Sequence, residues 1–445
     1  MLPLLLLACH APGPGPTAEP PPDLVLVVVD ALRADHMSLY GHPLPTTPAA
    51  DALAAESLVF DRALSHAGWT LPAMASLLTG RYPSEHQATR DAEDRLRFHR
   101  LDETLPTLAA LLQARGYRTG AWVNNAYLAP EFDLDRGFDR YDYRGAGGTD
   151  DRSAADTVAA ALAWLAESDQ PAFALLHLME PHYPYLPPER LRHRFTGPGA
   201  PPVAPLFFTP DELSGEARRE KRFSPEQVDW IGKVYDEEIL AADEALAALV
   251  AGLRSQGRWE RTALAFTADH GEELWDHGAF EHGHALYGEL IRVPLLIRAP
   301  DLAAGRVEAQ VQHADLFQTL LALGGAAPPA EAHGVDLRNL GDGQPDRPVL
   351  SEDCLYGPPR VALTQGGHRL IVNLSTHAVA VSAVDPFGQS DVPVRDPAEA
   401  QRLSAPLMEA LQAARGDLAI RALPDTTAPL TDENMEKLRA LGYIR

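Results

Sequence analysis

An uninterrupted apolar run near the start of the chain ends in a carboxylate. Residues 24–29 read Leu-Val-Leu-Val-Val-Val, and Asp30 follows directly. A continuous run rich in β-branched residues is typical of a strand buried on both faces, as in a parallel sheet. Because ligands of open α/β sheets bind beyond the carboxyl ends of the strands, Asp30 stands where chemistry is expected.

The same kind of run recurs later in the chain. Residues 262–267 form an apolar run just before Asp269 and His270, and residues 293–297 form a third. Strands that alternate with helices indicate an α/β fold, which we predict as a doubly wound mixed sheet flanked by helices. Further predicted elements are helices at residues 47–58, 104–115, 156–168 and 224–256, and strands at residues 119–124 and 172–178.

A Pro- and Gly-rich stretch at residues 324–334 marks a change in composition. Beyond it, short alternating runs separated by turn residues predict a small antiparallel sheet, with helical patterns near the C-terminus. These runs are residues 361–363, 369–373 and 378–383, and the helical patterns are residues 398–415 and 431–441. We therefore expect a main α/β domain at residues 23–325 and a small C-terminal α+β subdomain at residues 326–445.

The first 22 residues have the composition of a signal and a tether. Residues 6–9, Leu-Leu-Ala-Cys, resemble a bacterial lipobox, in which cleavage before the cysteine leaves Cys9 as a lipidated N-terminus. The preceding apolar run is short and lacks Lys and Arg, so a chance apolar N-terminus is the alternative. Residues 10–22 are rich in Pro, Gly and Ala, which suits an extended tether. We expect a lipid-anchored or periplasmic protein of the bacterial cell envelope, touching a membrane only through Cys9.

The composition narrows the classes of partner. The 445 residues are 45% hydrophobic, which is ample for a large core. The formal net charge of −24 argues against a nucleic-acid partner, which would need a basic surface. Only Cys354 would lie in the folded body, so we expect no disulfide framework and no thiolate metal cluster. We expect Cys354 to be a buried small apolar residue.

Two predicted strand ends carry residue types that bind metals. Asp30 follows one buried strand, and Asp269 and His270 follow another. Two carboxylates and an imidazole at neighbouring strand ends can converge on one divalent cation, whereas each acid alone could be an ordinary solvated strand end. The donor set leaves Ca, Mn, Zn and Mg all open.

Residues 65–83 supply a second chemical signal. Thr70 stands just before a helix predicted to begin near Pro72, where backbone N–H groups and the helix dipole favour an anion. This segment resembles the nucleophile segment of the sulfatase family, in the alkaline phosphatase superfamily. The family's two metal segments and its substrate-histidine segment are matched, in the family's order, by residues 30–41, 267–273 and 177–185. The resemblance covers the chain from Leu24 to its end and implies an alkaline phosphatase-like fold.

The chain departs from the sulfatase pattern at several positions. Sulfatases oxidise a Cys or Ser to formylglycine, but Thr70 holds that position, and threonine cannot give an aldehyde. Met74 replaces the family's Arg, Ala31 replaces a second metal-binding Asp, and neither family Lys is found. The resemblance therefore points to superfamily branches with a threonine nucleophile. It implies Thr70 as both nucleophile and metal ligand, with one divalent cation and no formylglycine.

Three histidines are candidates for contact with the substrate anion. The resemblance gives His182 contact with a substrate oxygen or protonation of the leaving group; buttressing a Pro-rich loop is the alternative. His282 and His284 flank Gly283 after the second metal segment, and one of them could replace a missing Lys. Either could instead complete a second zinc site with His182. We expect catalytic roles for His182 and His282 and a substrate-binding role for His284.

Other polar residues have weaker signals. Asn124 or its neighbour Asn125 could donate an amide N–H to the anion, and we predict Asn124 as substrate-binding, with an ordinary strand-end turn as the alternative. Arg81 could clamp the anion or form a structural ion pair. His177, inside an apolar strand, is expected to be a satisfied core histidine. The acids at residues 236–238 are expected on a solvated helix face.

These signals together predict a metal-dependent hydrolase or transferase of phosphate, phosphonate or sulfate esters. Its partner would be a small-molecule or envelope-derived anionic ester. A sulfatase proper, or a degenerate member that binds anions or glycans without catalysis, are the alternatives.

Overall fold

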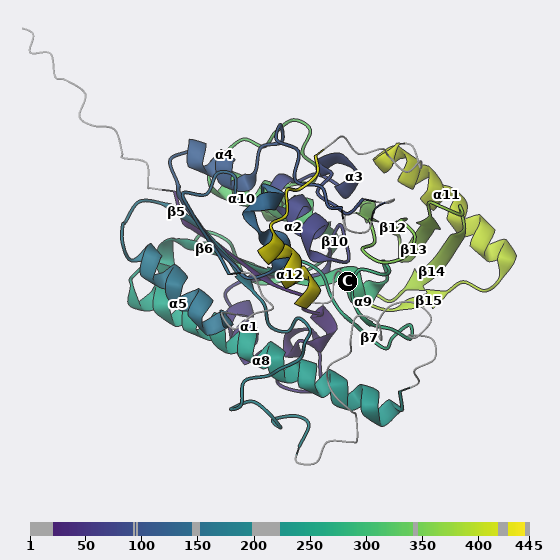
Figure 1. The fold of residues 1–445 in the computed structure, drawn as a ribbon, viewed down its shortest axis with the longest axis horizontal. Helices are drawn as coiled ribbons and strands as arrows, with labels where there is room; N and C mark the ends of the chain where they lie inside the picture. Colours follow the sequence, from purple (N-terminus) through teal and green to yellow (C-terminus); the bar gives the residue numbers. More distant parts are fainter. Residues whose placement is uncertain are drawn as a thin grey trace, which may run out of the picture.

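A mixed eight-stranded sheet forms the centre of the molecule (Figure 1). The computed structural model describes residues 21–91, 94, 97–144, 152–197, 223–340, 346–416 and 426–440. The strand order is β10-β2-β9-β6-β1-β5-β3-β4. The strands are β1 (Asp23–Val29), β2 (Leu58–Leu64), β3 (Arg118–Val123), β4 (Arg140–Tyr143), β5 (Ala172–Leu178), β6 (Thr262–Ala268), β9 (Arg292–Arg298) and β10 (Gly305–Gln312).

The middle of the sheet is parallel and buried on both faces. Strand β1 pairs in parallel with both β5 and β6, and every residue of these three strands is buried. Strand β9 runs antiparallel to β2 and β6. Val29 pairs with Ala268, so Asp30 and Asp269 are the next residues on neighbouring strands. The register therefore brings the two predicted metal ligands to the same edge of the sheet.

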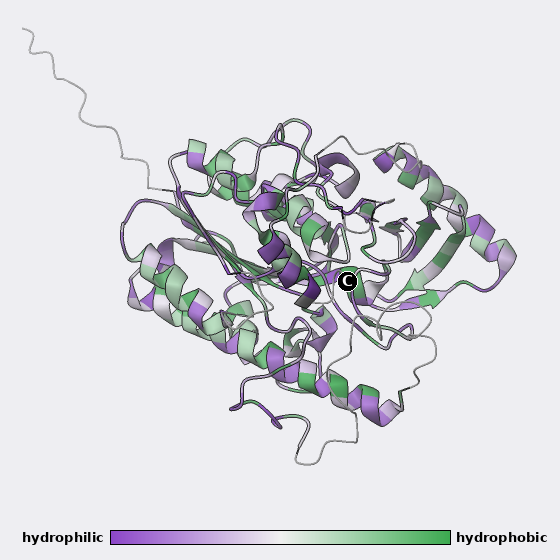
Figure 2. Cartoon of the chain, in the orientation of Figure 1, coloured by the Kyte–Doolittle hydropathy of each residue, from purple (hydrophilic) through white to green (hydrophobic). Residues whose placement is uncertain are grey.

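Helices cover both faces of the sheet (Figure 1). Helices α1 (Pro48–Ala54), α5 (Ala154–Leu165) and α8 (Pro225–Ser255) lie on one face, and α2 (Thr70–Thr79), α4 (Leu108–Ala114) and α10 (His313–Leu323) lie on the other. The 31-residue α8 begins with a capping box, in which Ser224 and Gln227 satisfy each other's backbone N–H groups. Figure 2 shows a mixture of hydrophilic and hydrophobic residues along α8, whereas the strands beneath it are mostly hydrophobic.

A separate antiparallel sheet follows the main one in sequence. Its order is β11-β12-β13-β14-β15, and α11 packs on it. The bounds are β11 (Val349–Glu352), β12 (Arg360–Gln365), β13 (His368–Asn373), β14 (Val379–Val384), β15 (Asp391–Pro393) and α11 (Pro397–Arg415). The short elements are α3 (Pro83–His86), α9 (Gly288–Ile291), α12 (Asp432–Ala440) and a two-stranded sheet of β7 (Glu273–Leu274) and β8 (Phe280–Glu281).

The architecture confirms the predicted fold class: a mixed α/β sheet between helices, followed by a small antiparallel sheet. The proposed boundary at residues 325 and 326 stays a prediction. Cys9 and most of the N-terminal tether lie outside the described residues. No helix in the described part of the chain has the length and apolar character that crossing a membrane requires.

Some elements differ from the sequence prediction. The predicted helix at residues 47–58 ends at Ala54, and Leu58 already begins the unpredicted β2. Asp61 and Arg62 interrupt the apolar pattern of β2, and β10 is an edge strand with exposed polar positions. The prediction of a solvated face at residues 236–238 is wrong, because all three acids are buried.

We predict that Gly271→Ala destabilises the fold beside the candidate metal ligands. A Cβ at Gly271 would lie 2.0 Å from the backbone oxygen of Glu289, which a side-chain rotation cannot relieve. We expect the free energy of unfolding to fall by about 2 kcal/mol or more, measured by urea titration. Gly305→Ala is the matched control, because its nearest neighbour would be a Leu58 methyl group 3.8 Å away. Equal stability of the two variants would contradict the prediction.

Candidate active site

Two carboxylates and an imidazole meet at the carboxyl ends of β1 and β6. Asp30, Asp269 and His270 each offer a ligand atom, and these atoms lie within 4.8 Å of one another. His270 Nε2 is 3.5 Å from Asp30 Oδ1 and 3.4 Å from Asp269 Oδ2. All three side chains are fully buried. The structure thus brings together the three residues that the sequence predicted as metal ligands.

Backbone groups orient these side chains. Asp269 Oδ1 accepts hydrogen bonds from the N–H groups of Ala31, at 3.2 Å, and His270, at 2.9 Å. His270 Nδ1 lies 2.8 Å from Gly271 O, and since a carbonyl only accepts, Nδ1 carries the proton. His270 Nε2 is therefore the unprotonated nitrogen, the form that binds metals.

Ala31 adopts a left-handed conformation with φ of 57°. Asp and Asn are several-fold enriched in this region, whereas alanine is not. The backbone next to Asp30 thus keeps a geometry that suits an Asp, although Ala31 supplies no carboxylate.

Thr70 is the first residue of α2 and is fully buried. Its Oγ1 lies 3.3 Å from His270 Nε2 and 3.3 Å from Asn125 Nδ2. Because His270 Nε2 is the acceptor nitrogen, the Thr70 hydroxyl donates to it and accepts from Asn125. The N-terminal cap residue, Trp69, makes no side-chain capping bond to α2. The hydroxyl is thus held at the start of a helix, within the same cluster.

Asn125, rather than the predicted Asn124, faces the cluster. Asn125 Nδ2 donates to Asp30 Oδ2 at 2.6 Å as well as to Thr70. Its Oδ1 accepts from the Tyr127 N–H at 2.9 Å, which fixes the orientation of the amide. Asn124 Nδ2 donates instead to His177 O and to Thr157. The sequence signal was the pair of asparagines after β3, and strand register decides between them.

The side chains of the cluster are suited to bind a divalent cation. Asp30 Oδ1 and Asp269 Oδ2 are buried and have no hydrogen-bond partner in the described part of the protein. Burial, and then the charge of Asp269, raise the pKa of Asp30 well above its usual value. Burial also raises the pKa of Asp269 and, followed by the charge of His282, lowers that of His270. Two carboxyl oxygens without hydrogen-bond partners in the described part of the chain, beside an unprotonated imidazole nitrogen, are donors that a divalent cation binds.

His182 and His282 lie beside the cluster. The His282 ring is centred 4.3 Å from that of His270 and 5.0 Å from that of His182. His282 Nδ1 is 3.0 Å from Glu272 Oε1, and His182 Nδ1 bonds the carbonyl oxygen of Tyr183. The carbonyl contact places a proton on His182 Nδ1, and the carboxylate contact holds a proton on His282 Nδ1.

Sequence reasoning missed Glu272. This carboxylate is fully buried, and Tyr185 donates its hydroxyl to Oε2 at 3.1 Å. With Oε1 it orients His282. Its position three residues after Asp269 could have indicated a role in the site. An acid in a loop is usually solvated, so the sequence favoured no such role.

His177 differs from its prediction as a satisfied core histidine. It is fully buried, but neither ring nitrogen has a hydrogen-bond partner in the described part of the chain. His177 Nε2 lies 3.5 Å from Asp30 Oδ2. The side chain thus borders the metal cluster, and burial lowers its pKa to about 3, so the ring is neutral at pH 7.

Two other predicted substrate-binding residues have partners outside the cluster. His284 Nε2 lies 2.5 Å from Glu273 Oε2. Arg81 follows the C-terminal end of α2, the opposite end from Thr70, where it bonds Glu331 O and lies 3.6 Å from Glu85 Oε2. These contacts favour the structural ion-pair alternative for Arg81. Roles for these two residues in substrate binding stay predictions.

Comparison with protein families identifies the class of this site. The model of the sulfatase family matches residues 22–326, which include every residue of the cluster. The chain belongs to the sulfatase family. This family of the alkaline phosphatase superfamily consists of ester hydrolases that are typically metal-dependent, so the predicted enzyme class is confirmed.

Two similar proteins carry names that describe different members of the superfamily. An ulvan-active sulfatase of Formosa agariphila is 27% identical over 369 residues, which cover 74% of this chain and 67% of the relative. The multifunctional alkaline phosphatase superfamily protein PehA of Trinickia caryophylli is 27% identical over 412 residues, covering 73% of this chain and 78% of the relative.

Solved structures show the same fold. The phosphonate monoester hydrolase of Agrobacterium radiobacter has a TM-score of 0.71 at 19% identity, and the match covers 89% of this chain and 96% of that one. A protein in complex with its substrate D-glucosamine-2-N,6-O-disulfate has a TM-score of 0.70 at 21% identity, covering 88% and 97%. At these identities the likeness shows the alkaline phosphatase-like fold alone.

We predict that a divalent cation stabilises the chelator-treated protein through Asp30 and Asp269. At a free ion concentration of 100 times Kd, the free energy of unfolding should rise by about 2.7 kcal/mol. Mn²⁺, Zn²⁺, Mg²⁺ and Ca²⁺ would each be tested by thermal unfolding, with bound ions counted by mass spectrometry.

Asp269→Asn should lose one bound ion and the stabilisation that this ion gives. The fully exposed Asp169 provides the matched control, Asp169→Asn, which should bind ions like the natural chain. An Asp269→Asn protein that binds as many ions as the natural chain would contradict the assignment.

Proposed function

We propose that this protein is a metal-dependent hydrolase or transferase of phosphate or phosphonate esters, with sulfate esters as poorer substrates, and that Thr70 is its nucleophile. One observation carries the proposal. Thr70 Oγ1 stands at the start of α2, 3.3 Å from His270 Nε2, beside two buried carboxylate oxygens that have no hydrogen-bond partner in the described part of the chain.

The position of Thr70 supports its role as nucleophile. In the resemblance, Thr70 occupies the site where sulfatases carry formylglycine, and it cannot be oxidised to an aldehyde. Its hydroxyl nevertheless lies among the candidate metal ligands, with Asn125 donating to it. The chain therefore retains an oxygen nucleophile in the family's frame.

We propose that Asp30, Asp269, His270 and Thr70 hold one divalent cation. When bound, such an ion lowers the pKa of a hydroxyl and neutralises charge on the transferred group. Asn125 fixes the position of Oγ1 relative to Asp30 through two donated hydrogen bonds. The N-terminus of α2 contributes its dipole to the side on which the anion would bind.

His182 and His282 suit proton transfer. His182 is held through Nδ1 by Tyr183 O, and His282 is held through Nδ1 by Glu272, so both rings are fixed beside the cluster. When Thr70 attacks, its hydroxyl proton would pass through His182 or His282 to the leaving oxygen, while an Oγ1–P bond forms and the bond from phosphorus to that oxygen breaks. In the second step, the same histidine would take a proton from the attacking water or alcohol and return it to Oγ1, as Thr70 is displaced from phosphorus.

The absence of an aldehyde favours phosphate over sulfate esters. A formylglycine hydrate releases sulfate by collapsing to the aldehyde, and a threonine ester lacks this exit. A phospho-threonine can be resolved by a second attack at phosphorus. One structure of this fold is named as a phosphonate monoester hydrolase, and another is in complex with its substrate D-glucosamine-2-N,6-O-disulfate, which supports an anionic ester as the substrate class.

The closeness of the His182 and His282 rings also favours a second arrangement. His182 and His282, whose rings lie 5.0 Å apart, could hold a second cation. The ion count of the natural chain against a His182→Gln, His282→Gln variant distinguishes this arrangement from proton transfer alone. A degenerate, non-catalytic member would not need the metal ligands, whereas the chain keeps Asp30, Asp269 and His270 together with the Thr70 hydroxyl.

We predict that Thr70→Ala lowers kcat/KM for nitrophenyl phosphate and phosphonate esters about 10³-fold or more, because the nucleophile is lost. Thr70→Ser should keep much of the activity. Thr79→Ala is the matched control, since Thr79 lies at the far end of α2 with its hydroxyl bonded to Ala75 O. A panel of phosphate monoester, diester, phosphonate and sulfate substrates would be assayed with the stabilising cation.

Acid-quenched natural enzyme should also carry one phosphoryl group on the peptide that contains Thr70, as detected by mass spectrometry. Full activity of Thr70→Ala, or cleavage of sulfate esters alone, would refute the nucleophile assignment.

We also propose that Cys9 anchors the protein to a bacterial envelope membrane, with residues 10–22 as tether. The lipobox-like residues 6–9 support this proposal. Cells given labelled palmitate should label the natural chain, whereas Cys9→Ser should remain unlabelled; Cys354→Ser is the control, because Cys354 is buried. Label on both variants, or on neither the natural chain nor the variants, would contradict the anchor.

A further inference from the structure

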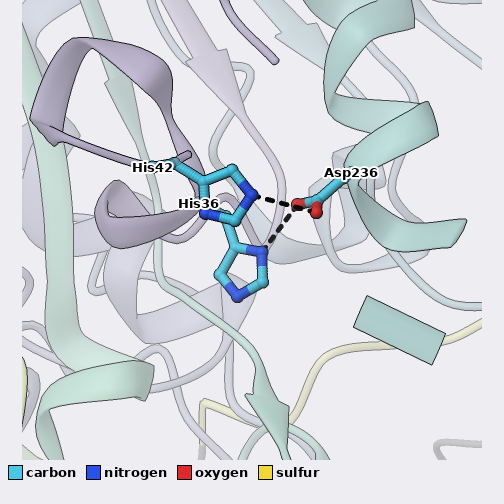
Figure 3. A group of neighbouring side chains, drawn as sticks. All are labelled: His36, His42 and Asp236. Carbon is cyan, nitrogen blue, oxygen red and sulfur yellow. Dashed lines mark hydrogen bonds and ion pairs between the residues drawn. The ribbon is translucent and has the colours of Figure 1, made fainter. Parts of the chain in front are cut away.

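A second cluster of metal-ligand residue types lies outside the Asp30 cluster (Figure 3). His36 ends the short helix η1 (Ala34–His36), and His42 follows the turn η2 (Ser38–Tyr40). Asp236 lies on α8 and is buried, contrary to its expected place on a solvated face. We call these three residues the α8 histidine cluster.

The local backbone brings the two histidines together. Gly41 has φ of 99°, a left-handed conformation that favours glycine, and closes the turn between them. The His42 N–H then donates to Met37 O at 3.2 Å. The two imidazoles stack, with ring centroids 4.9 Å apart and planes 23° from parallel.

Both imidazoles turn a nitrogen toward the same carboxylate, as Figure 3 shows. His36 Nδ1 lies 2.6 Å from Asp236 Oδ1, and His42 Nε2 lies 3.1 Å from Asp236 Oδ2. One ligand atom from each of the three residues falls within 4.8 Å of the others. Two imidazole nitrogens and one carboxylate oxygen form a common zinc-binding set.

Asp236 is a buried carboxylate that faces the two imidazoles. Across the described residues, its ion pairs are with His36 and His42 and with no Lys or Arg. Two stacked imidazolium ions would repel each other, whereas one divalent ion would neutralise the carboxylate and bind both neutral rings.

The cluster lies close to the protein surface. The side chains of His36 and His42 are 16% and 14% exposed, whereas that of Asp236 is 3% exposed. Donors at about 2.0 Å from a tetrahedral zinc lie about 3.3 Å apart, so His36 and Asp236 would separate by less than ~1 Å on binding.

The α8 histidine cluster also lies against the loop that carries Asp30. Tyr235, the residue before Asp236, donates its hydroxyl to Ala31 O at 2.7 Å and accepts from the Arg33 N–H at 2.9 Å. An ion at the cluster would therefore clamp this loop onto α8. We propose that His36, His42 and Asp236 bind a structural transition-metal ion of the zinc class, separate from the candidate active site.

The test is a zinc count on the full chain after chelator treatment, with free Zn²⁺ removed by gel filtration. The His36→Gln, His42→Gln double variant should bind one zinc fewer than the natural chain, with at least about 100-fold weaker affinity at the lost site. Asp269→Asn should retain that zinc. The count therefore distinguishes a failure of the proposed active-site metal from a failure of the metal proposed at the α8 histidine cluster. His368→Gln is the matched control, because His368 lies on β13 in the C-terminal sheet.

A second measurement does not depend on the folding of the double variant: anomalous X-ray scattering at the zinc edge locates zinc in the natural chain. Crystals of the natural chain grown with zinc should show a peak between His36, His42 and Asp236. No peak there at saturating zinc, or an equal zinc count in the folded double variant and the natural chain, would overturn the proposal and leave a hydrogen-bonded His–Asp–His group.

Discussion

The active-site region depends on the parallel pairing of β1 with β6. Because Val29 pairs with Ala268, the acids that follow them, Asp30 and Asp269, leave the sheet side by side. Two buried carboxylates so close repel each other, and burial disfavours both charges. Thr70, Asn125 and His270 surround the same point, where a divalent cation would compensate the charge of the pair.

The hydrogen bonds of the histidines add a second level of organisation. His182 and His270 each bond a backbone carbonyl through Nδ1, and His282 bonds Glu272. A carbonyl only accepts, so Nδ1 of His182 and Nδ1 of His270 carry protons. The Glu272 carboxylate likewise holds a proton on His282 Nδ1. These contacts fix the orientation of all three rings next to the site.

Helix α8 connects the site to the surrounding structure. Its three successive acids, residues 236–238, are buried and each has a separate structural task. Asp236 meets His36 and His42, Glu237 accepts backbone N–H groups of the 193–196 turn, and Glu238 bonds the Leu186 N–H. The acids therefore attach two loops that border the site, one of which begins at Asp30.

The sequence alone determined the class of fold and the core of the site. Unbroken apolar runs rich in β-branched residues favour strands buried on both faces, and acids that follow such parallel strands are brought to one edge of the sheet. Tertiary structure alone decided which neighbours serve the site: Asn125 over Asn124, Glu272 from a loop, and His177 beside Asp30. It also buried Asp236. The directions of such side chains depend on strand register and on the packing of distant segments. Neither can be derived from residue type and spacing.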